Sequence, residues 1–248
     1  MTFIWHSALH LESVNRVIHL RTPEEVEMIA CGGKIIASLF HEVAPLVIPG
    51  VSTADLDLFC DEYILSHDGA VPAFKGLYGF PGSVCTSVNE EVVHGIPSAS
   101  RILVSGDIVS IDVGVRLAGW CSDSAWTFVV GEVGNKAHSL LKTTEKALRF
   151  AINAARPGNH VGDIGTAVIA AVEGEDCKIV RDLVGHGVGQ EVHEEPQIPN
   201  IGRPGHGPLL REGMVLAIEP MLSAGSPEIR ALDDGWTVIT ADKALSAH

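Results

Sequence analysis

The stretch from Ser105 to Gly131, SGDIVSIDVGVRLAGWCSDSAWTFVVG, constrains the fold most, because it has the pattern of a β-hairpin that carries two acids. Side chains alternate between the faces of a strand, so Asp112 shares a face with Ile108 and Ser110. The opposite face is apolar and consists of Val109, Ile111, Val113 and Val115. We therefore expect the apolar face to lie in the core and the acids to project from the other side.

The polar residues from Arg116 to Gly119 favour a turn, and a pairing centred between Leu117 and Ala118 predicts that Asp112 lies directly opposite Asp123. Opposed residues have Cβ atoms about 4.5–5.5 Å apart, and like charges at that separation repel. Two such carboxylates need a cation between them, a shared proton or exposure to bulk water. Because the surrounding strand residues are apolar, we favour the cation over a solvated hairpin face.

Composition limits the class of protein. A chain of 248 residues with 46% hydrophobic content can form one domain with a large core. The net charge of −14 argues against nucleic acid or an anionic membrane as the main partner, and favours cations and small substrates. The cysteines are odd in number and scattered, so we expect no disulfide framework and a reducing, cytoplasmic location. They are Cys31, Cys60, Cys85, Cys121 and Cys177.

Residues 1–20 are interrupted by histidines and charged residues, so they predict neither a signal peptide nor a membrane span. We interpret them as an N-terminal extension and residues 21–248 as a single domain.

Helix signals occur twice in the same order. Thr22, Pro23 and Glu25 provide a cap, an N-terminal proline and a capping-box acid for a helix to about His41. Further helices are expected at residues 52–66, 136–155 and about 162–173, and strands and loops at 72–98.

The segments at 49–64 and 157–172 form a weak internal repeat, in which corresponding residues are separated by the same number of positions. Pro49, Gly50 and Asp55 coincide with Pro157, Gly158 and Asp163. The order helix, Pro-Gly, helix, strands repeats as well, which predicts an α+β fold of two similar halves whose strands meet in one sheet covered by helices.

The second half adds two candidate segments. The segment GHGVGQEVHEEP contains His186 and His193. It is not a phosphate-binding loop, because no apolar helix follows it. The glycines on both sides of His186 make a packed-core role for this histidine less favourable, because they leave little side-chain mass to pack. MVLAIE is an apolar strand that ends in Glu219, an acid better suited to ligation than to the surface. In the first half, His94 precedes Gly95 and Pro97.

Together, the segments CTSVNEEVVHGIP, GDIVSIDVGV, SDSAWTFVVG, GHGVGQEVHEEP and LAIEPM closely resemble the motif series of the type I, bacterial-type methionine aminopeptidases. The resemblance covers the chain from about Ile18 onward. It implies the pita-bread fold, which is shared with proline aminopeptidase, prolidase and creatinase, with two pseudo-symmetric halves. The segment between His193 and Glu219 leaves no room for the insertion typical of type II enzymes.

The same resemblance implies a centre of two divalent metal ions with ligands from both halves: Asp112, Asp123, His186 and Glu219. In that family, the acid at the position of Asp123 bridges both metals, and the histidines matching His94 and His193 contact the substrate. By family position, a pocket for one apolar side chain is formed by Tyr78, Phe80, Cys85 and Trp236. Tyr78 and Leu77 differ from the usual His and Tyr there.

Carboxylates with one imidazole favour Mn, Fe, Co or Zn, and two such ions can lower the pKa of a bridging water. The resulting hydroxide is expected to attack the first peptide bond, with Glu219 as proton shuttle and the two substrate-contacting histidines stabilising the tetrahedral intermediate. The implied partner is the N-terminus of a peptide or nascent chain, with possible ribosome association. Two alternatives stay open: a proline-directed peptidase on the same fold, and a catalytically impaired pita-bread protein that binds peptides.

Family members carry a further metal-bridging Glu on a segment resembling SA-x-x-E-H-T, whereas this sequence has Ser246, Ala247 and His248 at its end. From this resemblance and from the repeat, we expect a domain that lacks its last strand. The second metal would then be held weakly, by Asp112 and Asp123 alone, beside an unpaired sheet edge.

Overall fold

The computed structural model describes residues 17–248, so most of the expected N-terminal extension lies outside the described residues. The end of that segment contacts the domain, because Ile18 forms a bridge with Glu195. At the start of the domain, Arg21 N–H donates to the Gly213 carbonyl. The helices are α1 (Pro23–Val43), α2 (Thr53–Leu65), α3 (Asn135–Ala154) and α4 (Val161–Val172), with 3-10 turns η1 (Ala44–Leu46) and η2 (Leu77–Gly79).

The strands of the first half are β1 (Ala70–Pro72), β2 (Val84–Val88), β3 (Glu91–Val93), β4 (Ile108–Leu117) and β5 (Trp120–Val129). Those of the second half are β6 (Lys178–Ile179), β7 (Val184–Gly187), β8 (Glu194–Pro199), β9 (Leu216–Ala217), β10 (Leu222–Ser223), β11 (Ile229–Ala231), β12 (Val238–Thr240) and β13 (Ser246–Ala247). Their ladders are antiparallel and divide into four groups: β1-β4-β2 with β5 on β4, β13-β10-β6, β11-β12-β3 and β8-β7-β9.

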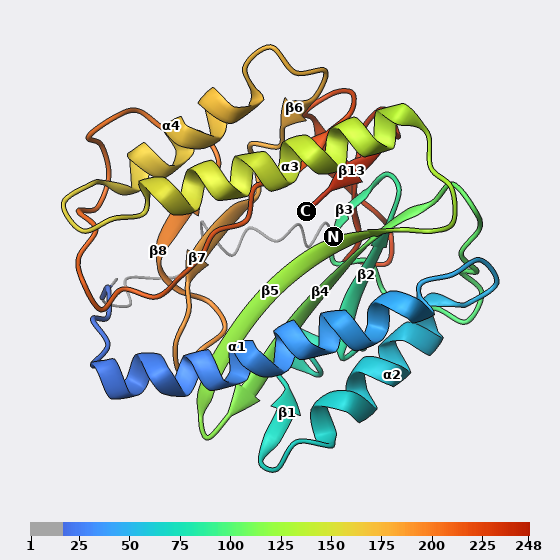
Figure 1. Cartoon of the computed structure of the whole chain (residues 1–248), viewed down its shortest axis with the longest axis horizontal. Helices are drawn as coiled ribbons and strands as arrows, with labels where there is room; N and C mark the ends of the chain where they lie inside the picture. The colour runs from blue at the N-terminus through green and yellow to red at the C-terminus, as the bar shows by residue number, and fades with distance from the viewer. Residues whose placement is uncertain (1–16) are drawn as a thin grey trace.

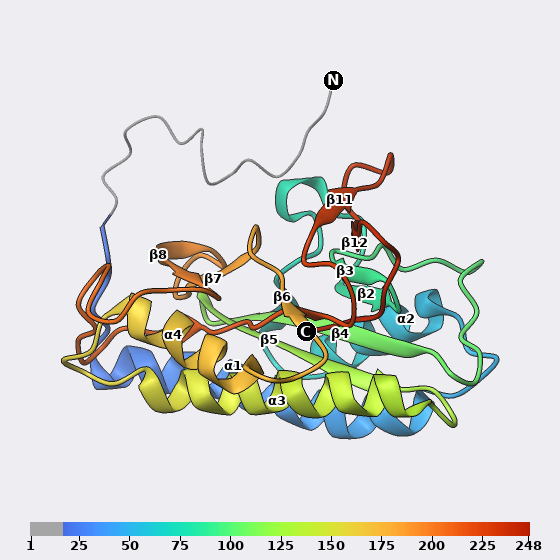
Figure 2. The ribbon, with the colours of Figure 1, turned by 90° about the horizontal axis from the view of Figure 1, so that it is seen from above.

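The helices form one layer and the strands another. Figure 2 shows α1, α3 and α4 along one side of the molecule, with β4, β5, β7 and β8 above them. In Figure 1, α1 and α2 cover the strands of the first half, and α3 and α4 cover those of the second. The centre of the strand layer is therefore the place where residues of the two halves meet.

The four predicted helices are confirmed, and so is the start signal predicted for α1. Thr22 caps α1 in a capping box with Glu25, and Pro23 occupies its first turn. Capping side chains satisfy backbone N–H groups that have no partner within the helix, which is why these short patterns locate helix starts well.

The internal repeat is a structural repeat. Gly50 and Gly158 have φ angles of +96° and +95°, and both lie just before a helix whose third residue is an acid. Asp55 accepts a hydrogen bond from Ser52 N–H (3.0 Å) and Asp163 accepts one from His160 N–H (2.7 Å). The same turn and the same capping geometry thus open α2 and α4.

The β4–β5 hairpin forms as expected, but its predicted register is wrong. Asp112 pairs with Ala125, and Asp123 pairs with Gly114. The turn is Ala118-Gly119, with φ angles of +50° and +85°, a two-residue loop whose twist matches that of the strands. This turn shifts the pairing by two residues, so the acids are diagonal neighbours that still share a face.

The core consists of two main apolar clusters, one under each pair of helices. The inner face of β4 packs on α1 and α2 with Val109, Ile111, Val113 and Val115 fully buried. The segment Pro23–Leu46 is long and apolar enough to cross a membrane, and it is the only one of that kind in residues 17–248. Its residues Ile36, Leu39 and Val43 are buried in this cluster, as expected for a core helix.

Candidate metal centre

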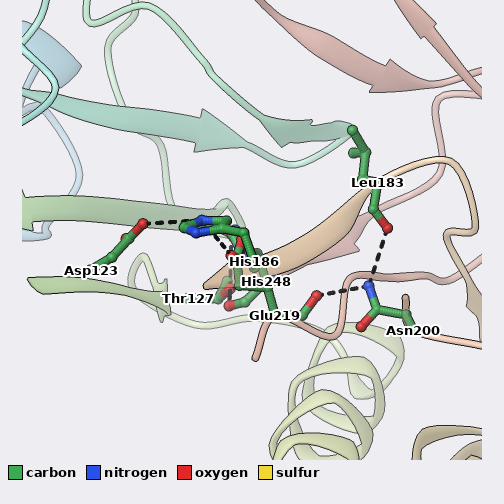
Figure 3. A network of polar contacts seen from close by, with 8 residues as sticks. Asp123, Thr127, Leu183, His186, Asn200, Glu219 and His248 are labelled. Carbon is green, nitrogen blue, oxygen red and sulfur yellow. Dashed lines mark hydrogen bonds and ion pairs between the residues drawn. The ribbon is translucent and has the colours of Figure 1, made fainter. Parts of the chain in front are cut away.

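Three of the four predicted metal ligands meet where the two halves adjoin. One donor atom from each of Asp123, His186 and Glu219 lies within 4.8 Å of the other two. His186 Nε2 is 3.5 Å from Asp123 Oδ2 and 3.1 Å from Glu219 Oε1 (Figure 3). The fourth predicted ligand, Asp112, lines the same cavity as Asp123 and Glu219.

The glycines beside His186 allow its strand to approach its neighbours. β7 lies between β8 and β9, and His186 pairs with Ala217. A Cβ atom at Gly185 would clash with the Ala217 carbonyl, and one at Gly187 would clash with the Glu195 carbonyl. The glycines therefore serve close strand packing, which brings His186 to the carboxylates.

Glu219 lies two residues after the end of β9, which is shorter than the strand predicted for the MVLAIE segment. Its backbone carbonyl accepts a hydrogen bond from Asn200 Nδ2 (2.8 Å), which also reaches the Leu183 carbonyl (Figure 3). Asn200 is 2% exposed, so this polar residue orients the backbone of Glu219 from inside the fold. No motif in the sequence points to Asn200; the available signal is its polar side chain in an apolar segment.

The pKa values of the site residues are shifted by burial and by the charges of their neighbours. Burial, followed by the charges of Asp123 and Glu219, raises the pKa of Asp112 well above its ordinary value. Burial alone would lower the pKa of His186, but its contacts with Asp123 and Glu219 raise it to about 11. Burial alone would raise the pKa of Glu219, yet His186 and His248 lower it. The protonated imidazole of His186 thus balances part of the negative charge of the acids, as a bound cation would.

The donor set fits a divalent transition metal. His186 Nδ1 lies 2.9 Å from the Gly187 carbonyl, so Nδ1 is the donor and Nε2 is directed at the carboxylates. Glu219 Oε1 is buried and accepts no hydrogen bond of acceptable geometry from residues 17–248. Two donors each about 2.1 Å from one ion lie about 3.0–3.4 Å apart at octahedral or tetrahedral angles, close to the separations found here.

The predicted apolar pocket residues form one cluster, apart from Tyr78. Phe80, Cys85 and Trp236 pack together, and the rings of Phe80 and Trp236 are 5.1 Å apart. Cys85 is the strand partner of Asp112, so their side chains lie on the same face of the sheet. Tyr78 is 65% exposed and instead stacks against His193, with ring centres 6.0 Å apart.

The two predicted substrate histidines differ in position. His94 directly follows β3, and burial lowers the pKa of its imidazole to about 4, so it is neutral at pH 7. His193 lies just before β8, and its ring is 4.5 Å from the ring of His186. His193 is thus adjacent to a predicted ligand.

A cavity of about 480 Å³ reaches the carboxylates from the side of α3. Asp112, Asp123, Glu219 and His248 line it together with residues of β5 and α3. Its lining includes neither of the two histidines discussed above nor any predicted pocket residue. His248, for which the sequence predicts no role in the site, thus lies beside the predicted ligands.

The family model of metallopeptidase family M24 matches residues 27–241. The chain belongs to this family of metallopeptidases. Methionine aminopeptidases are among its similar proteins: that of Clostridium perfringens is 48% identical over 94% of this chain and 92% of its own, and methionine aminopeptidase 1 of Bacillus subtilis is 47% identical over 94% and 93%.

Solved structures agree with these relatives. The crystal structure of methionine aminopeptidase from Thermotoga maritima matches with a TM-score of 0.91 and 42% identity, over 93% of this chain and 92% of that chain. A prolidase from Pyrococcus furiosus matches with a TM-score of 0.72 at 23% identity, over 94% of this chain and 60% of that chain, which shows the shared fold alone. The predicted α+β pita-bread fold is thus confirmed.

Proposed function

We propose that this protein is a metal-dependent aminopeptidase that removes the N-terminal methionine from peptides and nascent proteins. The observation that carries the proposal is the meeting of Asp123, His186 and Glu219 within 4.8 Å, in a chain whose similar proteins are methionine aminopeptidases. A cluster of apolar side chains near these acids supports a substrate with an apolar first residue.

Each residue of the centre has a role in the proposed reaction. Asp112, Asp123, His186 and Glu219 would hold two divalent ions, with Co, Mn, Fe or Zn suited to this set of oxygen and nitrogen donors. When bound, the ions supply Lewis acidity and a water of lowered pKa. Glu219 is placed to accept a proton and pass it to the departing amine, because its carboxylate lies among the other ligands.

The histidines act on the substrate in this proposal. The low pKa of His94 leaves a neutral imidazole that can donate a hydrogen bond without bringing a charge into the centre. His193 lies beside His186 and can reach the same reacting group. Phe80, Cys85 and Trp236 would receive the methionine side chain, and Tyr78, which is exposed, would border the entrance.

The cellular setting belongs to the same proposal. A free peptide N-terminus is the partner, and it becomes accessible as a chain leaves the ribosome, so we place the protein in the cytoplasm with possible ribosome association. The net charge of −14 argues against direct binding to nucleic acid or to anionic membranes.

The test is to incubate the metal-loaded protein with Met-Ala-Ser and with Xaa-Pro peptides, and to measure the released amino acid. Release of methionine from Met-Ala-Ser alone supports the proposal. Cleavage confined to Xaa-Pro would identify a proline-directed peptidase, and no cleavage of either would favour a peptide-binding protein. Glu219→Gln serves as the inactive control.

A further inference from the structure

His248 lies beside Glu219 and makes a contact that none of the roles above uses. Its Nε2 is 3.3 Å from Glu219 Oε2, while Glu219 Oε1 faces His186. The carboxylate therefore presents one oxygen to each of two imidazoles, as Figure 3 shows. The His248 side chain is 4% exposed and that of Glu219 is 22% exposed, so the contact is mostly shielded from solvent.

The Nε2 atom of His248 is buried and makes no hydrogen bond of acceptable geometry with residues 17–248. Glu219 Oε1, the oxygen that faces His186, is likewise buried and makes no hydrogen bond of acceptable geometry with residues 17–248. Buried polar atoms are almost always satisfied in native proteins, by protein, water or an ion. Two such atoms lie around one carboxylate, and a cation shared by Glu219 and His248 would satisfy both at once.

The backbone of His248 is fixed from two sides. Its N–H donates to Thr127 Oγ1 (3.0 Å), and the Thr127 hydroxyl lies 2.8 Å from its carbonyl. Thr127 is on β5 four residues after Asp123, so both side chains are on the same face of the strand. On its other side, Ala247 pairs with Leu222 of β10. His248 is thus held in place next to the carboxylates.

The separation of His248 Nε2 and Glu219 Oε2 fits two ligands of one ion. Donors about 2.1 Å from a shared metal lie about 3.0–3.4 Å apart, and 3.3 Å falls in that range. The pair Glu219 and His186 meets the same criterion through the other oxygen, at 3.1 Å. Glu219 can therefore connect two cation positions, each with its own imidazole.

We propose that His248 is a metal ligand, binding through Nε2 the ion that Glu219 Oε2 also contacts. This inference rests on the proposed metal centre but is independent of the peptide substrate. It replaces the expectation that the second ion is held by Asp112 and Asp123 alone. The competing assignment is a hydrogen bond from His248 that only orients Glu219.

The direct test counts imidazoles on the metal. Mn²⁺ is bound to the protein labelled with ¹⁵N-histidine, and pulsed EPR measures how many histidine nitrogens couple to it. We expect one coupled histidine when the first ion binds and a second, distinct one at full loading. A single coupled histidine at full loading would overturn the proposal, and this measurement needs no variant. No bound Mn²⁺ at all would overturn the metal centre as well.

A variant identifies the second imidazole. In His248→Gln we expect the second coupling to disappear and the second Mn²⁺ to bind at least about 10-fold more weakly by calorimetry, with the first unchanged. His206→Gln, at an exposed position that hydrogen-bonds Pro204, is the matched control and should keep both. Retention of both couplings in His248→Gln would overturn the proposal, even if activity fell.

Discussion

At the scale of single residues, the two acids of the hairpin are not equivalent. Asp123 Oδ2 lies 3.5 Å from His186 Nε2, whereas Asp112 is outside the three-residue group. We expect Asp123→Asn to remove more metal than Asp112→Asn, because the Asp123 variant would lose contacts to both proposed ions. Elemental analysis after dialysis measures the stoichiometry. Full and equal occupancy in the two variants would mean that neither acid is a ligand.

His94 and His193 are expected to act on the substrate and not on the metal. His94→Ala and His193→Ala should retain metal and lose roughly 10²–10³ in kcat/KM, the effect of removing one transition-state donor. Steady-state kinetics and metal analysis on the same samples check this. His206→Ala is the control for histidine removal in general. Metal loss in either of the first two variants would contradict the assignment.

At the scale of elements, α1 packs on β5 through one glycine. A Cβ atom at Gly32 would lie 2.5 Å from Ser122 Oγ, which itself donates to the Ile29 carbonyl. We expect Gly32→Ala to destabilise the protein by roughly 1–3 kcal/mol, the usual cost of overpacking. Urea unfolding measures the difference.

The neighbouring glycine is the matched control. Gly33 is in the same helix, and no atom lies within 4 Å of the position of an added Cβ. Gly33→Ala is therefore expected to stabilise by about 0.4–1 kcal/mol, since it restricts only the unfolded chain. Similar effects of Gly32→Ala and Gly33→Ala would show that the α1–β5 contact is not tight.

The segment that carries His193 is joined to the start of α1 by a buried ion pair. Arg21 pairs with Glu194, their side chains are 8% and 11% exposed, and the guanidinium lies over the Trp120 ring at 5.1 Å. We expect Arg21→Gln to cost roughly 3–5 kcal/mol, because it leaves a buried carboxylate unpaired. It should also raise KM, since His193 adjoins Glu194.

The comparison is the exposed pair of Lys34 and Glu27, whose side chains are 70% and 65% exposed. Lys34→Gln should change stability by less than about 1 kcal/mol. Arg21→Lys should rescue only part of the loss, because lysine lacks the planar fork that stacks on the indole. If Arg21→Gln behaved like Lys34→Gln, the ion pair would have no positioning role.

At the scale of the whole molecule, the proposed metal ligands come from both halves. Asp112 and Asp123 come from β4 and β5, and His186 and Glu219 come from the second half. Metal binding should therefore stabilise the entire domain. At about 100 times Kd, binding adds about 2.7 kcal/mol, which corresponds to a rise in Tm of about 5–11 °C for a chain of this size.

Calorimetry with and without chelator measures that shift. The metal-loaded protein should melt at the higher temperature, and Asp123→Asn should show little difference between the two conditions. The same Tm with and without chelator in the unaltered protein would contradict a metal centre shared by the halves.

The sequence by itself determined the local elements and the residue types of the centre. The capping pattern at Thr22 located the start of α1, because its hydrogen bonds are made within four residues. Strand alternation determined which face the hairpin acids share, because the side-chain period is two. The motifs that resemble the aminopeptidase family identified the candidate ligands among many other acids and histidines.

Only the tertiary structure decided how distant residues meet. The hairpin register depends on a turn at Ala118-Gly119 that alternation does not define, so the predicted opposition of the two acids failed by two residues. The contact of Glu219 with His248 joins segments that no local pattern connects. Its geometry follows from the pairing of β13 with β10 and from the hydroxyl of Thr127, because long-range packing alone sets these distances.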